Sequence, residues 1–200
     1  MNSGDSTLIT NLTSNEGRAL LWLARNTIAR CLGQTAEESP DPATAEALAS
    51  PRLQERRGVF VTLKSGGRLR GCIGSLSAAG SVVDGVRDNA VKAASCDPRF
   101  PCLTAEELPG VRIEVSVLTP LEPLTYDGAG DLVSRLQPGR DGVLIEQDGL
   151  SATFLPQVWE QLPEPERYLG QLCLKAGLPG SAWREGRLRV ETYQVQSFAE

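Results

Sequence analysis

Apolar residues recur with two different periods in the first part of the chain. Thr13 and Glu16 match a capping box, and apolar residues follow at helical spacing: Leu20, Ala24, Ile28 and Cys31. This pattern predicts a first helix with Cys31 on its buried side. Over residues 59–76 the apolar residues alternate with others on both sides of a turn sequence at 65–67, which predicts a β-hairpin.

The rest of the pattern predicts further helices and strands. Residues 81–95 have helical spacing and end at Asp97-Pro98, while residues 111–118 alternate strictly and form the clearest predicted strand. The turn sequence Asp148-Gly149 divides a second predicted hairpin. Shorter segments predict the remaining elements: helical turns within 35–53 and 104–110, helices at 156–162 and 164–177 with Cys173 on a buried side, and a last strand near 188–195.

This order of elements predicts an α+β fold, in which β-hairpins and a mixed sheet carry helices packed on them. Residues 1–12 are predicted to be an N-terminal tail and residues 13–198 to form the domain. The order is compatible with two similar halves, although no sequence repeat proves a duplication.

Composition narrows the classes of function. The 200 residues are 40% hydrophobic and 22% charged, and the net charge of -5 with scattered basic residues argues against nucleic acid as a partner. No apolar run reaches the ~18 residues that span a membrane, and the N-terminus lacks the basic and apolar regions of a signal peptide. We therefore expect a cytoplasmic protein without membrane contact.

The residues that commonly carry catalysis are restricted. The chain contains no histidine, which excludes a histidine general base or metal ligand within it. The five cysteines form no CxxC pair, which argues against a disulfide framework and a zinc site. We expect no metal and no cofactor, and any catalysis must use other side chains or groups from a partner.

The first candidate segment is Arg70-Gly71-Cys72-Ile73-Gly74. Strict alternation places Arg70 and Cys72 on one face and Leu69 with Gly71 on the other, so that Cys72 looks outward beside a guanidinium that favours its thiolate. Glycine within a strand indicates a bulge, or close approach of a ligand or another backbone. The alternative, slightly favoured by this segment alone, is a packed Cys72 where two elements cross.

Two further segments combine polar groups. Prolines fix the loop that contains Asp97 and Arg99, which suits a binding loop, although a turn acceptor and a surface ion pair would explain it equally well. Cys96 and Cys102 flank this loop and could form a redox pair only if it folds back. On the strand at 111–118, Glu114 and Ser116 share the second face, where they could accept a proton or bind a polar group, or simply face solvent.

Five segments together resemble the AMMECR domain family: "LRGCIGSL", "NAVKAASCDPRFPCLTAEEL", "VRIEVSVLTPLEPL", "GRDGVLIEQDGLSATFLPQVWEQL" and "YLGQLCLKAGLP". They occur in the family's order, over about residues 16–198. The resemblance implies an α+β fold of a larger and a smaller part with a cleft between them and the RGCIG cysteine near it. It also implies the A component of an AmmeMemoRadiSam system, with a Memo-like protein and a radical SAM protein as partners.

The resemblance implies one shared site but no reaction. Its members are Cys72, Arg70, Asp97, Arg99, Glu114 and Ser116. The chain departs from the family at Ser95-Cys96, at Cys102 and at Leu121, and none of these positions falls within RGCIG.

Two hypotheses about function follow from these residues. In the first, Cys72 is a nucleophile or ligand for a small molecule, Arg70 or Arg99 favours its thiolate and Glu114 accepts a proton, while Gly71 and Gly74 admit the substrate.

In the second, the chain is a non-catalytic adaptor for the Memo-like and radical SAM proteins. Here Cys72 is a packed core residue, and Arg70, Asp97 and Arg99 recognise the partner. The sequence predicts no oligomeric state.

Overall fold

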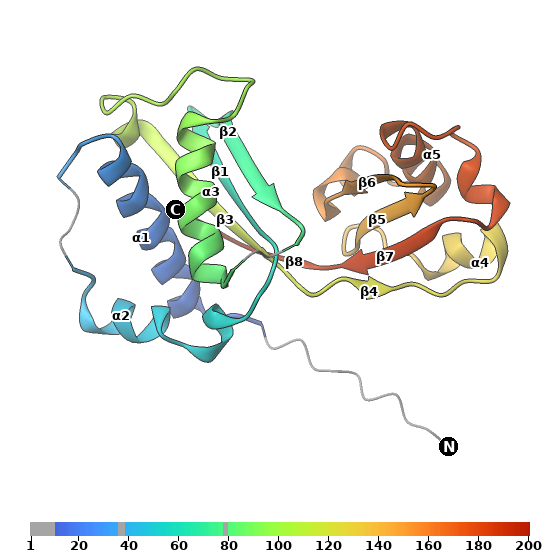
Figure 1. Cartoon of the computed structure of the whole chain (residues 1–200), viewed down its shortest axis with the longest axis horizontal. Coiled ribbons are helices and arrows are strands. Elements are labelled where there is room, and N and C mark those ends of the chain that lie inside the picture. Colours follow the sequence, from blue (N-terminus) through green and yellow to red (C-terminus); the bar gives the residue numbers. More distant parts are fainter. Residues whose placement is uncertain (1–10, 36–38, 78–79) are drawn as a thin grey trace. The chain divides into compact units, whose positions relative to one another are not determined.

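A computed structural model describes residues 11–35, 39–77 and 80–200, and it has the predicted α+β architecture. Most of the predicted N-terminal tail, residues 1–10, and positions 36–38 of the helical segment within 35–53 lie outside the described residues. The chain divides into two compact units (Figure 1). The first contains the described residues up to Leu118 together with Gln196–Glu200, and the second is Thr119–Val195.

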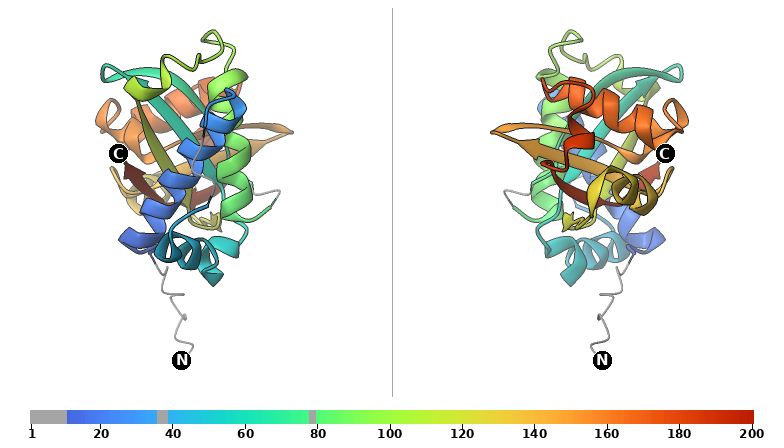
Figure 2. Two further views of the ribbon diagram at one scale, coloured as in Figure 1. Left: turned by 90° about the vertical axis from the view of Figure 1, so that its left-hand side faces the viewer. Right: turned by 90° about the vertical axis from the view of Figure 1, so that its right-hand side faces the viewer.

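The first unit is a four-stranded sheet with helices on one face. Its strand order is β2-β1-β3-β8, and its strands are β1 (Val59–Ser65), β2 (Arg68–Ser75), β3 (Val111–Leu118) and β8 (Val195–Ala199). Helices α1 (Ser14–Cys31) and α3 (Val82–Ser95) lie on the same side of this sheet (Figure 2). The core lies between these layers, because the alternating residues of β1 and β3 meet the apolar sides of both helices: Val59, Val61, Leu63, Val111, Ile113, Val115 and Val117.

Both long helices begin where the sequence predicts them. Thr13 and Ser81 each form a capping box with the residue three positions on, and α3 buries Val82, Val86 and Ala90 at helical spacing. The seven-residue α2 (Pro42–Leu48) follows the N-cap Asp41. The prediction of a buried Cys31 is wrong: it is the last residue of α1 and exposed, because the buried side of α1 ends at Ala29.

The second unit is built around its own sheet, of order β4-β7-β5-β6. The strands are β4 (Glu122–Pro123), β5 (Gly142–Gln147), β6 (Leu150–Phe154) and β7 (Arg189–Tyr193), accompanied by helices α4 (Gly128–Arg135) and α5 (Pro165–Lys175). The predicted hairpin with its Asp148-Gly149 turn is confirmed, as is the buried Cys173 on α5. Short 3-10 helices complete the chain: Pro51–Gln54, Leu108–Gly110, Pro156–Glu160 and Ala182–Glu185.

Three details of the fold differ from the sequence predictions. The sequence predicts a mixed sheet, but the sheets are antiparallel: the paired strands β1–β2, β1–β3, β4–β7, β5–β6 and β5–β7 run in opposite directions. Strands β3 and β8 are also antiparallel, because Ile113 contacts Glu200 and Ser116 contacts Ser197. The last strand is split at Gln194 into β7 and β8, which belong to different sheets. Helix α4 was not predicted, because its glycines resemble a loop. No helix in the described part of the chain combines the length and apolarity needed to cross a membrane.

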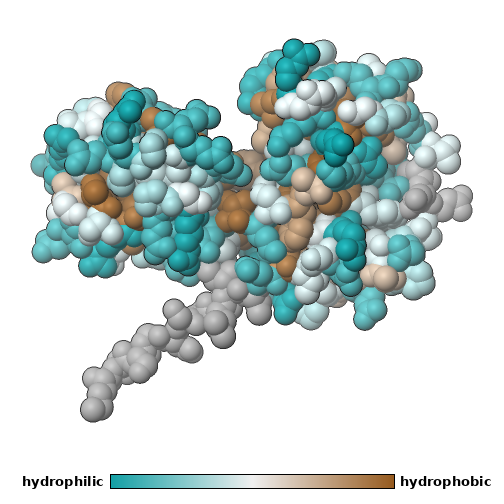
Figure 3. All heavy atoms as spheres, turned by 180° about the vertical axis from the view of Figure 1, so that it is seen from behind, coloured by the Kyte–Doolittle hydropathy of each residue, from teal (hydrophilic) through white to brown (hydrophobic). Residues whose placement is uncertain are grey.

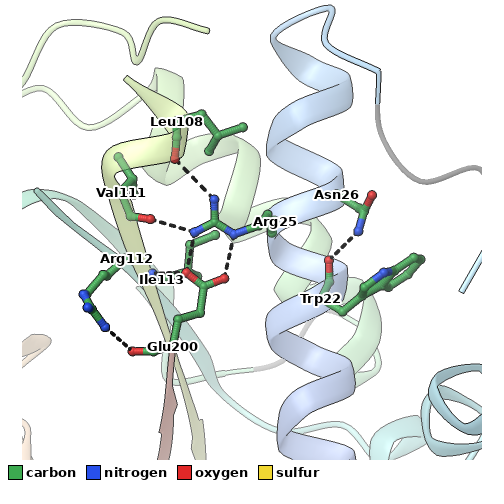
Figure 4. A network of polar contacts seen from close by, with 8 residues as sticks. All are labelled: Trp22, Arg25, Asn26, Leu108, Val111, Arg112, Ile113 and Glu200. Atoms are coloured by element: carbon green, nitrogen blue, oxygen red, sulfur yellow. Dashed lines mark hydrogen bonds and ion pairs between the residues drawn. The ribbon is translucent and has the colours of Figure 1, made fainter. Parts of the chain in front are cut away.

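A polar network attaches the end of β8 to α1 (Figure 4). Arg25 forms a bidentate ion pair with the Glu200 carboxylate and also donates to the carbonyl oxygens of Leu108 and Val111 at 3.2 and 2.6 Å. The same carboxylate accepts a hydrogen bond from the backbone N–H of Ile113 at 3.0 Å. One guanidinium therefore joins α1, β3 and β8, and the hydrogen bonds to Glu200 raise the pKa of Arg25.

We expect an Arg25→Ala variant to lower the free energy of unfolding by about 2 kcal/mol, because it removes the bidentate partner of the Glu200 carboxylate and the donor to two carbonyl groups. Urea unfolding followed by circular dichroism measures this change. The matched control is Arg68→Ala, which removes an exposed arginine of β2 and should change stability by less than about 0.5 kcal/mol. Equal midpoints for the two variants would contradict the role given to the network.

Candidate functional site

The candidate site lies on the face of the first unit's sheet that α1 and α3 do not cover. Cross-strand pairing places Cys72 of β2, Thr62 of β1 and Glu114 of β3 in one row, and Gly74, Phe60 and Ser116 in the next. We call this surface the open face. Figure 3 views the chain from the side away from the two helices, where hydrophilic residues predominate with apolar ones between them.

A β-bulge at Arg70 decides which residues are neighbours in this row. Ser65 pairs with Arg68 and Lys64 with Leu69, but Leu63 then pairs with Gly71, so Arg70 has no partner on β1. The bulge shifts the register by one residue. As a result Thr62 lies opposite Cys72, whereas an uninterrupted hairpin would place it opposite Gly71.

The bulge also overturns the predicted faces of β2. Leu69 is exposed and lies opposite Lys64, so it does not share the core face with Gly71 as strict alternation predicts. Arg70 is held by other groups: Glu107 binds it bidentately at 3.0 Å, and the carbonyl oxygens of Pro101 and Cys102 accept from it at 2.9 and 3.3 Å. Its guanidinium is thus committed to the loop after α3, and it lowers the pKa of Glu107.

Cys72 is half-buried and has one hydrogen bond at its sulfur. The Thr62 hydroxyl donates to it, with Oγ1 and Sγ 3.2 Å apart. This closeness follows from the pairing, because the N–H and C=O of Cys72 point away from β1 and the side chains of such a pair approach closely. A hydroxyl donor stabilises a sulfur that carries negative charge.

Asp97 and Arg99 hold the backbone of Cys72 from the outer edge of the sheet. The Asp97 carboxylate accepts from the Cys72 N–H at 2.8 Å, and Arg99 Nη2 donates to the Cys72 carbonyl oxygen at 3.2 Å. Arg99 also binds Asp97 through Nε and Nη2, at 2.9 and 2.7 Å. The Asp97 side chain is 2% exposed and that of Arg99 is 55% exposed. The pair therefore provides hydrogen-bond partners for the N–H and C=O of Cys72, which would otherwise be unpaired at the sheet edge, and the Arg99 side chain remains partly exposed to solvent.

This clamp makes the first unit sensitive to acid. Hydrogen bonds from Arg99, joined by the Cys72 N–H, hold the pKa of Asp97 below its ordinary value, so its contribution to stability is present above pH ~4 and lost as pH falls further. We expect Asp97→Asn to lower the urea midpoint at pH 7 and to leave less further loss between pH 5 and pH 3 than in the parent protein. Parallel pH profiles for the two proteins would contradict this assignment.

At both glycines of the segment, the space that a side chain would occupy is taken up by other atoms of the protein. A Cβ atom at Gly71 would lie 2.3 Å from the carbonyl oxygen of Ala93 on α3. A Cβ atom at Gly74 would lie 2.2 Å from the ring of Phe60, which covers it from β1. Gly71 thus permits the close approach of another backbone, one of the three explanations that the sequence left open for glycine in this strand.

The polar residues of β3 are neighbours on the open face, as predicted, and each has a partner. Lys64 donates to the Glu114 carboxylate at 2.7 Å, and the hydroxyl groups of Ser116 and Ser197 are 2.8 Å apart. Thr62 lies between Glu114 and Cys72 in the row. The face therefore presents a thiol and a charged Lys64–Glu114 pair on either side of one hydroxyl.

The structure brings some predicted site residues together and separates others. Asp97 and Arg99 contact Cys72 directly, whereas Arg70 is bound to Glu107 and the following loop. Sequence reasoning missed four residues in contact with the predicted ones: Phe60, Thr62, Lys64 and Glu107. Alternation along β1 could have placed the first three on one face, but the bulge hides which of them meets Cys72.

The loop between Cys96 and Cys102 does fold back on α3. The Leu103 N–H donates to the Ala94 carbonyl oxygen at 2.7 Å, and the Cys102 thiol contacts the Ser95 carbonyl oxygen at 3.3 Å. Both cysteines are exposed free thiols. Among the residues that the structure describes, no group of three acidic or cysteine side chains is arranged to hold a metal ion.

Comparison with known proteins covers almost the whole chain. The family model AMMECR1 matches residues 21–198. A protein of Methanosarcina barkeri is 40% identical over 190 residues (94% of this chain, 92% of that protein), and one of Methanothermobacter thermautotrophicus is 38% identical over 191 residues (94% and 96%). The crystal structure of an uncharacterized protein from Pyrococcus horikoshii superposes with a TM-score of 0.80 at 33% identity, covering 94% of this chain and 93% of that one.

Proposed function

The chain belongs to the AMMECR1 family, and from this premise we propose that its open face is a small-molecule site in which Cys72 is the reactive or binding group. The observation that carries the proposal is the hydrogen bond from the Thr62 hydroxyl to the Cys72 sulfur. A cysteine that only fills space needs no donor at its sulfur, whereas a thiolate nucleophile or ligand gains from one.

The surroundings of Cys72 support this role in a chain without histidine. The Asp97–Arg99 pair binds both the N–H and the carbonyl oxygen of Cys72, so the backbone that carries the sulfur has little freedom. Of the two arginines predicted to favour the thiolate, the partly exposed Arg99 lies against the segment, whereas Arg70 is bound to Glu107. Glu114 is the proposed proton acceptor, and with Lys64 it offers the ligand a charged pair at the other end of the row.

A protection experiment tests the proposal. The low-molecular-mass filtrate of an extract from the producing cells is added to the protein, and alkylation of Cys72 and Cys102 by iodoacetamide is followed by peptide mass spectrometry. We expect saturable slowing at Cys72 only, and a weaker effect in a Lys64→Gln variant. Equal slowing at both cysteines, or none at Cys72, would reject a small-molecule site on the open face.

A second candidate function is supported by the exposure of the bulged edge. Leu69 is 43% exposed and Arg99 projects into solvent from the loop beside it. An adaptor in an AmmeMemoRadiSam system could present this edge to a Memo-like or radical SAM protein. In this case the macromolecular fraction of the extract, rather than the filtrate, would protect Cys72, and Arg99→Ala would abolish that protection.

A further inference from the structure

A polar cavity lies in the first unit, on the helix side of the sheet and away from the open face. Its volume is about 240 Å³, and it is lined by residues of α3, the start of β1 and the end of β2. Val59, which lines it, belongs to the core side of β1, opposite to Thr62 and Cys72. The cavity is therefore separate from the proposed Cys72 site.

Two deeply buried polar side chains line this cavity. Arg57 is 9% exposed and donates through Nε and Nη2 to Glu55, and Asn89 is 8% exposed and donates through Nδ2 to the Val59 carbonyl oxygen at 3.0 Å. Within the described residues, Arg57 Nη1 and Asn89 Oδ1 form no hydrogen bond, and neither is among the buried atoms without a partner, so both atoms can be reached from solvent. A buried guanidinium and a buried carboxamide thus each keep one polar atom for a group that enters the cavity.

Two charged residues of α3 line the same cavity and are separated by one helical turn. Asp88 and Lys92 form no ion pair with each other or with any other residue that the structure describes. By contrast, Asp84, which also lines the cavity, is committed to the Ser81 capping box and to Arg87. The cavity wall therefore offers one uncommitted carboxylate and one uncommitted ammonium group, in addition to Arg57.

We propose that this cavity binds a small zwitterion of the α-amino acid type. A purely anionic ligand would meet the Asp88 carboxylate, and a purely cationic one would meet Arg57 and Lys92, so a ligand with both charges suits the lining best. Its carboxylate pairs with Arg57 Nη1 and Lys92, its ammonium with Asp88, and Asn89 accepts from a polar hydrogen. A volume of about 240 Å³ is below the range of drug-sized sites, which limits the ligand to a free amino acid or a molecule of similar size.

Nuclear magnetic resonance titration of the full chain with each of the twenty amino acids tests this assignment. We expect at least one to produce saturable shifts of the Asn89 side-chain amide and the Arg57 Nε–H signals. Acetate, ethylamine and inorganic phosphate, which carry one sign of charge each, should bind at least about tenfold more weakly, equivalent to about 1.4 kcal/mol. Binding of acetate or phosphate as tight as that of the best amino acid would overturn the zwitterion assignment.

Charge-removing variants on α3 supply the matched comparison. Lys92→Gln and Asp88→Asn should each weaken binding of the best amino acid about tenfold, because each removes the partner of one ligand charge. Arg68→Gln, which removes an exposed charge of β2 outside the cavity, should leave the affinity within about twofold. No saturable shift with any amino acid, or equal affinities in all three variants, would overturn the proposal, and neither result bears on Cys72.

Discussion

A Gly71→Ala variant should lose about 3 kcal/mol or more of unfolding free energy. The reason is the Ala93 carbonyl oxygen, 2.3 Å from the position of the new methyl group. This oxygen belongs to the backbone of α3, so no side-chain rotation relieves the overlap. Either α3 or β2 must move, and the packing between them is lost. Urea unfolding of the purified variant measures the effect.

Gly110→Ala is the control for this prediction. A Cβ atom at Gly110 meets no atom within 4 Å, and its backbone is not in the left-handed region. The substitution should therefore change stability by less than about 0.5 kcal/mol. A Gly71→Ala protein as stable as Gly110→Ala would show that the segment's first glycine serves something other than contact with α3.

A Thr62→Val variant should slow the alkylation of Cys72 at neutral pH by about tenfold. Valine keeps the branched shape of threonine but removes the hydroxyl that donates to the sulfur over 3.2 Å. A hydrogen bond to a charged acceptor is worth about 1.5–3 kcal/mol, and the loss of about 1.4 kcal/mol of stabilisation in the transition state of alkylation corresponds to a tenfold slower reaction. Quenched iodoacetamide labelling with peptide mass spectrometry gives the rate.

Two internal comparisons accompany the Thr62→Val measurement. Thr62→Ser keeps the hydroxyl and should retain most of the parent rate at Cys72. The exposed Cys102, whose thiol contacts Ser95, should react at the same rate in all three proteins. Unchanged labelling of Cys72 in Thr62→Val would show that the hydrogen bond from Thr62 does not affect the reactivity of the sulfur, and would contradict the proposed function.

The elements of this fold could largely be predicted from local patterns. The capping box at Thr13, the helical spacing of residues 81–95 and the alternation of residues 111–118 are local signals, and each element that they predict is present. Exposed Cys31 shows the limit of such signals, because helical periodicity does not say how far the covering layer extends. Splitting of the last strand between two sheets depends on tertiary pairing and has no local signature.

The composition of the site could be predicted better than its contacts. Cys72, Asp97 and Arg99 were candidates from their segments, and the structure places all three in contact. The role expected of Arg70 depends on strict alternation, which the bulge interrupts. Glycine within this strand indicates a bulge as one possibility, but it does not say that Arg70 is the residue left without a partner on β1.

The central claim is that Cys72 is a positioned, reactive thiol on an open sheet face, and competitive labelling of all five cysteines tests it most directly. The folded protein is exposed to a limiting amount of iodoacetamide, and the modified peptides are quantified by mass spectrometry. We predict that Cys72 reacts faster than the exposed Cys31, Cys96 and Cys102, and that Cys173, buried in α5, reacts only after unfolding. A Cys72 that reacts no faster than the three exposed cysteines, or only after unfolding, would contradict the account.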